Sequence, residues 1–186
     1  FELTDFDKII LGIDPGPNVL GLGIIGVNKN ELSIITSGVV KLNKLANHEL
    51  KLKSIFENIT QLIEKYLPDE VAIEAPFFGK NVQSMLKLGR AQGVAMAAVL
   101  IKDIPIKEYS PRKIKKSITG NGASSKEQVA AMLKTILKLN ELPKLLDATD
   151  GLAAAVCHYY QFNEGEQDKN YSNWKSFVKN NPKRTS

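Results

Sequence analysis

Three short runs rich in β-branched and aliphatic residues open the chain, at residues 9–14, 19–27 and 31–40. The segments between them, residues 15–18 (Pro-Gly-Pro-Asn) and 28–30 (Asn-Lys-Asn), are typical turn sequences. Connections this short join strands that run antiparallel to each other. The first 40 residues therefore predict an antiparallel meander.

Beyond the meander, helical and strand patterns alternate. Residues 48–67 carry apolar side chains at three- and four-residue spacing, and residues 82–102 predict a second long helix. Two short apolar runs, at 71–75 and 104–109, predict strands. Strands that alternate with helices are usually parallel. The expected fold is therefore α/β, with a mixed five-stranded sheet and flanking helices.

Shorter helices are predicted in the second half of the chain. Ser110 and Pro111 provide an N-cap and a first-turn proline for a short basic helix. Ser125 and Gln128 have the spacing of a capping box, which predicts the start of another helix. A last helix is expected over about residues 147–160.

Length and composition indicate one folded domain. The chain has 186 residues, of which 43% are hydrophobic and 24% charged, as in globular proteins. We expect a domain over residues 1–162 and a polar tail over residues 163–186. The longest apolar stretch, residues 94–101, is much shorter than the roughly 20 residues of a membrane span. The single cysteine, Cys157, allows no intramolecular disulfide, which fits a cytoplasmic location.

Positive charge is concentrated in one segment. Residues 107–126 hold six basic residues against one acid, Glu108, and so account for the whole formal net charge of +5. The basic residues are Lys107, Arg112, Lys113, Lys115, Lys116 and Lys126. A solvated helix face is the plainer interpretation of such a run. A local positive potential of this kind also suits a polyanion such as nucleic acid.

Four carboxylates stand out by their positions. Asp14 ends the first apolar strand and Glu74 ends a short buried strand, while Asp147 and Asp150 share one face at a helix start. Taken singly, each has a structural explanation as a turn cap, a buried ion-pair partner or a helix N-terminal charge. Taken together, they should meet at the sheet edge where α/β proteins commonly bind ligands.

Carboxylates gathered in one cleft repel one another unless cations share the site. Oxygen donors favour hard ions, so we expect two Mg²⁺ ions per site, with Mn²⁺ able to substitute. Two such ions can activate a water and stabilise the leaving oxygen of a phosphodiester. The two histidines, His48 and His158, do not have the spacing of a zinc site with Cys157. The sequence therefore predicts a metal-dependent nuclease in which His158 has a structural role.

Six segments in order across residues 8–161 resemble the RuvC family of Holliday-junction resolvases. They are Ile-Leu-Gly-Ile-Asp14-Pro-Gly, Ala-Ile-Glu74, Lys80-Asn81 with Leu86-Lys-Leu-Gly-Arg-Ala-Gln-Gly93, Glu108-Tyr109, Ser125-Lys126-Glu-Gln-Val129, and Asp147-Ala-Thr-Asp150-Gly-Leu-Ala. The resemblance implies a ribonuclease H-like fold. It also implies a structure-specific endodeoxyribonuclease that acts in DNA recombination and repair.

The resemblance also implies roles for individual residues. Asp14, Glu74, Asp147 and Asp150 match the family's catalytic, metal-binding acids, and Phe77 matches an aromatic residue that contacts DNA bases. Lys115 and Lys126 match basic residues near the cleaved strand. With the rest of the basic segment, the expected DNA-binding residues are Phe77, Lys80, Arg112, Lys113, Lys115, Lys116 and Lys126.

The expected partners are four-way junction DNA and a second copy of the chain. A homodimer would place two identical sites on strands of like polarity, and the small residues Gly89 and Gly93 of the second helix could form its contact. The branch-migration proteins RuvA and RuvB are further candidate partners. Partners in a membrane are not expected.

Three other functions fit part of the pattern. A junction-binding scaffold without catalysis would not need the complete set of acids. A sugar-kinase or actin-like ATPase is suggested by Gly-Ile-Asp14-Pro-Gly, but such proteins carry a second phosphate loop for which 186 residues leave no room. A general ribonuclease H would share the acids and would cleave an RNA–DNA hybrid.

Overall fold

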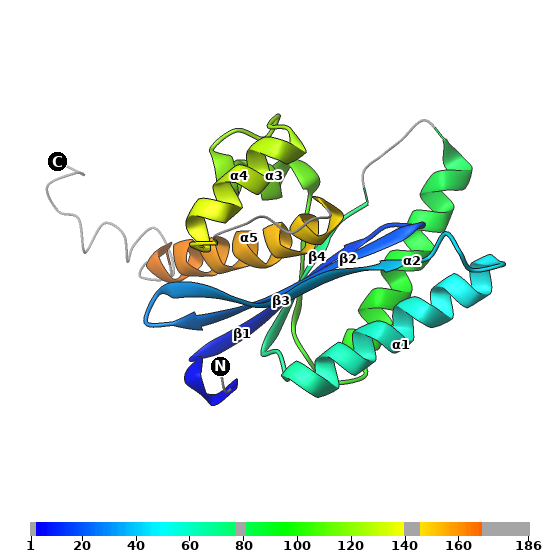
Figure 1. Cartoon of the computed structure of the whole chain (residues 1–186), viewed down its shortest axis with the longest axis horizontal. Coiled ribbons are helices and arrows are strands. Elements are labelled where there is room, and N and C mark those ends of the chain that lie inside the picture. The colour runs from blue at the N-terminus through cyan, green and yellow to red at the C-terminus, as the bar shows by residue number, and fades with distance from the viewer. Residues whose placement is uncertain (1–2, 77–80, 140–145, 169–186) are drawn as a thin grey trace, which may run out of the picture.

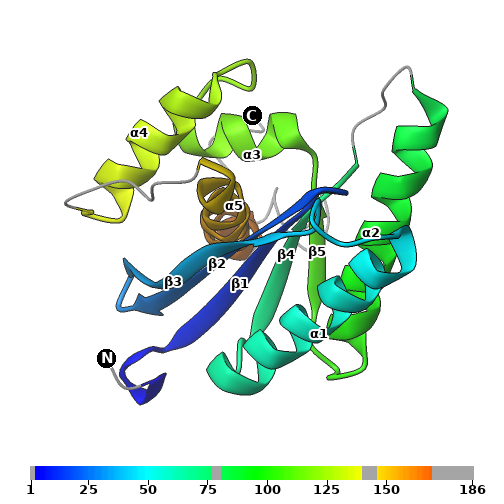
Figure 2. The same ribbon diagram turned by 45° about the vertical axis from the view of Figure 1, so that its right-hand side comes forward.

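The computed structural model describes residues 3–76, 81–139 and 146–168. Its centre is a five-stranded sheet (Figure 1), whose strands lie in the order β3-β2-β1-β4-β5 (Figure 2). The strands are β1 (Lys8–Pro15), β2 (Val19–Asn28), β3 (Glu31–Lys41), β4 (Glu70–Glu74) and β5 (Ile106–Tyr109). The first three pair antiparallel, whereas β4 runs parallel to β1 and β5 runs parallel to β4. The predicted mixed sheet is confirmed.

The helices form a layer on each face of the sheet. They are α1 (His48–Tyr66), α2 (Val82–Leu100), α3 (Pro111–Thr119), α4 (Lys126–Ile136) and α5 (Leu146–Asp168), and a short 3-10 turn, η1 (Leu3–Asp5), precedes β1. Figure 2 shows α1 and α2 on one side of the sheet and α3, α4 and α5 on the other. Helix α5 packs directly on β1 and β2, and α3 and α4 pack against α5.

Local capping chemistry starts the helices where the sequence predicts. The Ser110 hydroxyl accepts a hydrogen bond from the Lys113 backbone N–H at 3.2 Å. A complete capping box joins Ser125 and Gln128 at the start of α4. None of the helices in the described ranges has the length and apolar character of a membrane-spanning segment.

The predicted end of α5 is wrong. We expected the helix to stop near residue 160, but it continues to Asp168 and takes in residues 163–168 of the predicted tail. These residues lack an apolar period, so the hydrophobic pattern gave no sign that the helix continues. The rest of the predicted tail, residues 169–186, lies outside the described residues. Helix α2 ends at Leu100, two residues earlier than expected.

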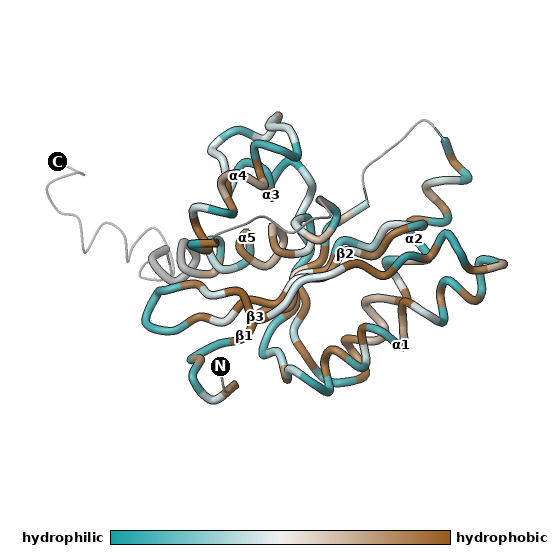
Figure 3. The backbone as a smooth tube through the Cα atoms, in the orientation of Figure 1, coloured by the Kyte–Doolittle hydropathy of each residue, from teal (hydrophilic) through white to brown (hydrophobic). Residues whose placement is uncertain are grey.

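Two hydrophobic clusters lie on opposite faces of the sheet, because successive side chains of a strand point to opposite sides. One includes Ile13 and Ile73 with Ile59 of α1, and the other includes Ile10 with Leu133 of α4 and Leu152 of α5. In Figure 3 the strands are drawn mostly in the brown of hydrophobic residues. The sheet is therefore the apolar centre that supports both helical layers.

Glycines let α5 lie in backbone contact with the sheet. A Cβ atom added to Gly12 would be 2.0 Å from the carbonyl oxygen of Gly151, and one added to Gly23 would be 2.5 Å from the Leu152 nitrogen. A Cβ on Gly21 would lie 2.4 Å from the Asp147 carbonyl oxygen. Distances this short exclude any side chain. The start of α5 is thereby held directly on β1 and β2.

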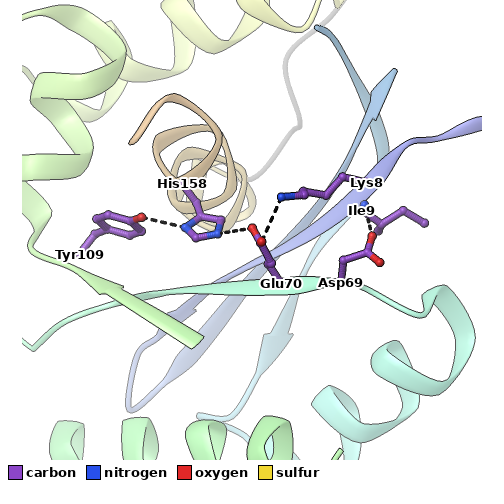
Figure 4. Close-up of polar contacts among 6 residues, drawn as sticks. All are labelled: Lys8, Ile9, Asp69, Glu70, Tyr109 and His158. Atoms are coloured by element: carbon purple, nitrogen blue, oxygen red, sulfur yellow. Dashed lines mark hydrogen bonds and ion pairs between the residues drawn. The ribbon is translucent and has the colours of Figure 1, made fainter. Parts of the chain in front are cut away.

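A buried polar network ties the middle of α5 to the other strands (Figure 4). The Tyr109 hydroxyl lies 2.7 Å from Nδ1 of His158, whose Nε2 lies 2.7 Å from a Glu70 carboxylate oxygen. Lys8 donates to the other Glu70 oxygen at 3.0 Å and stacks over the Phe162 ring at 3.6 Å from its centroid. The network joins β1, β4 and β5 to α5.

The pKa shifts fix the direction of these hydrogen bonds. Burial opposes the ionised form of Glu70, but the hydrogen bonds from Lys8 and His158 outweigh it and lower the pKa of the carboxyl. Burial lowers the pKa of His158 below its usual value, which favours the neutral ring at pH 7. An ionised carboxylate can only accept, so Nε2–H donates to Glu70 and Nδ1 accepts from the Tyr109 hydroxyl. As expected, His158 has a structural role.

The contact between α5 and the sheet predicts a large effect of Gly12→Ala. The new methyl group would collide with the backbone of Gly151, so we expect a loss of about 3 kcal/mol or more in the free energy of unfolding. Urea denaturation followed by circular dichroism measures this. Gly38→Ala on β3 is the matched control, because its Cβ would meet nothing within 4 Å. Equal stabilities of the two variants would disprove the close contact.

The buried network predicts that Tyr109→Phe destabilises the protein by about 1–3 kcal/mol, because Nδ1 of His158 would lose its donor in a buried site. Tyr159→Phe is the control, since the Tyr159 hydroxyl donates to the Asn30 carbonyl at an exposed position. That change should cost less than about 0.5 kcal/mol. Thermal unfolding of both variants measures the difference, and a neutral Tyr109→Phe would contradict the assigned network.

Candidate active site

Carboxylates from three distant parts of the chain line one small cavity. Asp14 and Glu74 lie at the carboxyl ends of β1 and β4, which are parallel neighbours. Asp150 in the first turns of α5 joins them on the wall of a cavity of about 180 Å³. The other lining residues are Pro111, Ile114, Lys115, Lys126, Val129 and Ala153.

Asp147 lies at the rim and is connected to the cavity by Lys126. The Lys126 ammonium lies 2.5 Å from an Asp150 oxygen and 3.4 Å from an Asp147 oxygen. The Asp147 side chain is 48% exposed, against 16% for Asp150. Three of the four predicted acids therefore line one cavity at the sheet edge. The fourth, Asp147, lies outside the cavity and is linked to it through its ion pair with Lys126.

Burial and mutual repulsion make ionisation of these acids costly. Burial, together with repulsion from Asp150 and Asp147 and against the opposing effect of Lys126, raises the pKa of Asp14 to about 6. Burial raises the pKa of Glu74 to about 8, with added repulsion from Asp14 and Asp150. The pKa of Asp150 is also raised by burial, although Lys126 counteracts the shift. Groups perturbed in this way are typical of functional sites.

A larger cavity elsewhere has none of this chemistry. It measures about 330 Å³ and lies between α1 and the strands β2 and β3. Among the residues that the structure describes, its lining includes Asn58, Gln61 and Lys65 but no carboxylate. We therefore identify the candidate site by the convergence of its charged groups and not by cavity size.

The predicted basic residues divide into two sets. Lys115 and Lys126 line the acidic cavity, whereas Arg112, Lys113 and Lys116 are exposed on α3. Buried Ile114 and Ile118 fix the inner side of α3. Phe77 and Lys80, the remaining predicted DNA contacts, lie outside the described residues.

The donor set suits a hard divalent cation, because every candidate ligand is a carboxylate and the acids repel one another where they stand. No group of three Asp, Glu, His or Cys side chains within the described ranges is yet close enough to surround an ion. The Lys126 ammonium lies between the carboxylates of Asp147 and Asp150, where a metal ion bound by both would have to lie. The residues fit a metal ion by chemistry.

The glycines beneath α5 were not among the residues predicted to matter for the site. Gly12, Gly21 and Gly23 are isolated glycines within strands, and such glycines often mark a close backbone approach. That signal could have identified them. The contact of Lys126 with the two aspartates had no comparable signal, because it joins residues on different helices.

Residues 10–158 match the family described as crossover junction endodeoxyribonuclease RuvC. A RuvC from Cytophaga hutchinsonii is 60% identical over 176 residues, covering 95% of this chain and 87% of the relative. One from Bacteroides fragilis is 58% identical over 180 residues, with 96% of each chain covered.

A solved structure described as T. thermophilus RuvC in complex with Holliday junction substrate superimposes with a TM-score of 0.79. It is 30% identical in sequence, and the match covers 85% of this chain and 96% of that one. The expected ribonuclease H-like fold is thereby confirmed. This chain belongs to the RuvC family of crossover junction endodeoxyribonucleases, which are metal-dependent nucleases.

Proposed function

We propose that this protein resolves four-way (Holliday) DNA junctions in homologous recombination and DNA repair, by symmetric hydrolysis of phosphodiester bonds. The observation that carries the proposal is the cavity in which Asp14, Glu74 and Asp150 meet beside Lys115 and Lys126. The carboxylates needed for metal-assisted hydrolysis and the lysines that can neutralise a phosphate then lie in one site. The junction-bound relative provides the substrate class.

Asp14, Glu74, Asp147 and Asp150 would hold two Mg²⁺ ions, with Mn²⁺ as a substitute. Bound there, the ions would activate a water and stabilise the leaving oxygen of the phosphodiester. Asp14 is the central ligand in this proposal, because it ends β1 next to the parallel strand that carries Glu74 and lines the same cavity as Glu74 and Asp150. The apolar residues Ile114, Val129 and Ala153 complete the cavity wall.

The basic residues would place the DNA. Lys115 lies in the cavity wall, where it can neutralise the phosphate next to the acids. The exposed residues Arg112, Lys113 and Lys116 would contact the backbone farther along the duplex. We include Phe77 and Lys80 in the DNA interface on the basis of the sequence alone.

The active form would be a homodimer, because two cuts on strands of like polarity require two identical sites. Helix α2 is the candidate contact: Cβ atoms added to Gly89 and Gly93 meet nothing within 4 Å, and Val82 and Leu86 are exposed. We place the protein in the cytoplasm, where the chromosomal substrate would lie. RuvA and RuvB remain proposed partners.

Asp14→Asn tests the function directly. The change removes the charge but keeps the size of the side chain, so we expect cation-dependent nicking of a synthetic four-way junction to fall by roughly a hundredfold or more. Junction binding, measured by gel shift without divalent cations, should be largely retained. Asp103→Asn is the control, because Asp103 is exposed and has a positive φ that asparagine tolerates.

Nicking by Asp14→Asn at the wild-type rate would reject the site assignment. Junction binding without any cleavage by the wild type would favour the scaffold. Preferential cleavage of an RNA–DNA hybrid would favour a ribonuclease H.

The cost of ionising Glu74 predicts that Glu74→Gln stabilises the metal-free protein. The folded-state pKa of about 8 lies above the ordinary value of 4.5, so ionisation weakens the wild-type fold as pH rises between these values. In the presence of a chelator, the variant should gain about 1–3 kcal/mol at pH 8 and almost nothing at pH 4.5. Urea unfolding across this range measures the gain. Glu57→Gln, at an exposed position, should show no such trend.

A further inference from the structure

Lys126 is poorly explained by the helix that carries it. It is the first residue of α4, whose start is already stabilised by the capping box of Ser125 and Gln128. Positive charge at a helix N-terminus opposes the helix dipole, so the lysine does not favour α4 locally. Its side chain instead reaches α5, where it pairs with both Asp147 and Asp150.

The charge of Lys126 lies within the acidic site and contacts two of its acids. Lys115 also lines the cavity, but within the described ranges both ion pairs to these acids come from Lys126. The ammonium therefore occupies space between Asp147 and Asp150 that a divalent cation would need. Two like charges at such short range repel each other, so the lysine and a metal ion would compete for the same oxygens.

We propose that Lys126 is an internal counter-cation of the metal-free site, and that it leaves Asp147 and Asp150 when a divalent cation binds. The inference rests on the proposed function, since it needs these acids to be metal ligands. Lys126 stabilises the folded protein before metal arrives and weakens metal affinity in the absence of DNA. Once displaced, its ammonium is free to bind a DNA phosphate at the cavity mouth.

The side chain has the freedom that this exchange needs. Lys126 is 50% exposed, and its flexible four-carbon stem can turn into solvent while the capped backbone stays in place. Asp147 is similarly exposed at 48%, whereas Asp150 is anchored at 16%. The exchange therefore requires rotation of a surface side chain and no movement of α4 or α5.

Mn²⁺ binding to the full-length protein without DNA, measured by electron paramagnetic resonance, tests the proposal. Lys126→Met retains the length of the stem but removes the charge, and we expect it to bind Mn²⁺ roughly tenfold more tightly than the wild type. In chelator the same variant should unfold at a lower temperature than the wild type. Saturating Mn²⁺ should then raise that temperature more than it does for the wild type.

Two controls make the result specific. Lys134→Met removes one positive charge from the exposed last turn of the same helix, α4, and should leave Mn²⁺ affinity unchanged. Lys126→Arg preserves the charge and should keep affinity near the wild-type value. A merely structural role for Lys126 predicts lower stability with unchanged or weaker Mn²⁺ binding, which would overturn the proposal.

The test separates this inference from the proposed function. If Asp14→Asn abolishes Mn²⁺ binding while Lys126→Met leaves it unchanged, the acids hold the metal and the competition is disproved. If Asp14→Asn binds Mn²⁺ as tightly as the wild type, the site assignment itself fails. Tighter binding by Lys126→Met, lost when Asp14→Asn is added, supports both.

Discussion

Direct backbone contact between the start of α5 and strands β1 and β2 is the constraint on which the site depends. A Cβ atom added to Gly12 of β1 would lie 2.0 Å from the Gly151 carbonyl oxygen, and one added to Gly151 would lie 2.6 Å from the Leu22 carbonyl carbon of β2. Glycine inside a helix costs about 1 kcal/mol relative to alanine, so Gly151 weakens α5 locally. In return, the helix lies close enough to the sheet for Asp150 to share a cavity with Asp14.

The two glutamates of β4 show how placement decides what an acid does. Glu70 begins the strand, receives hydrogen bonds from Lys8 and His158, and has a lowered pKa. Glu74 ends the same strand among other acids, and burial raises its pKa to about 8. The first contributes stability when ionised, whereas the second reduces it. An acid that is buried among like charges is costly to ionise, which is why Glu74 indicates function and Glu70 indicates structure.

Local sequence pattern could predict the elements but not the contacts between them. Residues that are near in sequence determine the meander and the capped starts of α3 and α4. They also determine the strand ends that carry Asp14 and Glu74. The bond between Glu70 and His158 spans 88 residues, and that between Lys126 and Asp150 spans 24. Such pairs depend on how α5 packs on the sheet and how α4 packs on α5, and no period or cap encodes that packing.

The position of helix α5 also explains why the basic segment of residues 107–126 lies next to the cavity lined by Asp14, Glu74 and Asp150. Helices α3 and α4 both pack against α5, so α5 positions their lysines as well as its own Asp147 and Asp150. In α3, buried Ile114 and Ile118 turn one side inward, which leaves Lys115 beside the cavity and Lys113 exposed. The exposed basic side chains of α3, which can attract a polyanion from a distance, thus lie next to Lys115, which lines the acidic cavity. A shift of α5 on its glycine contacts would move Asp147 and Asp150 together with the lysines of α3 and α4. The positions of the acidic and the phosphate-binding groups therefore depend on the same contact between α5 and the sheet.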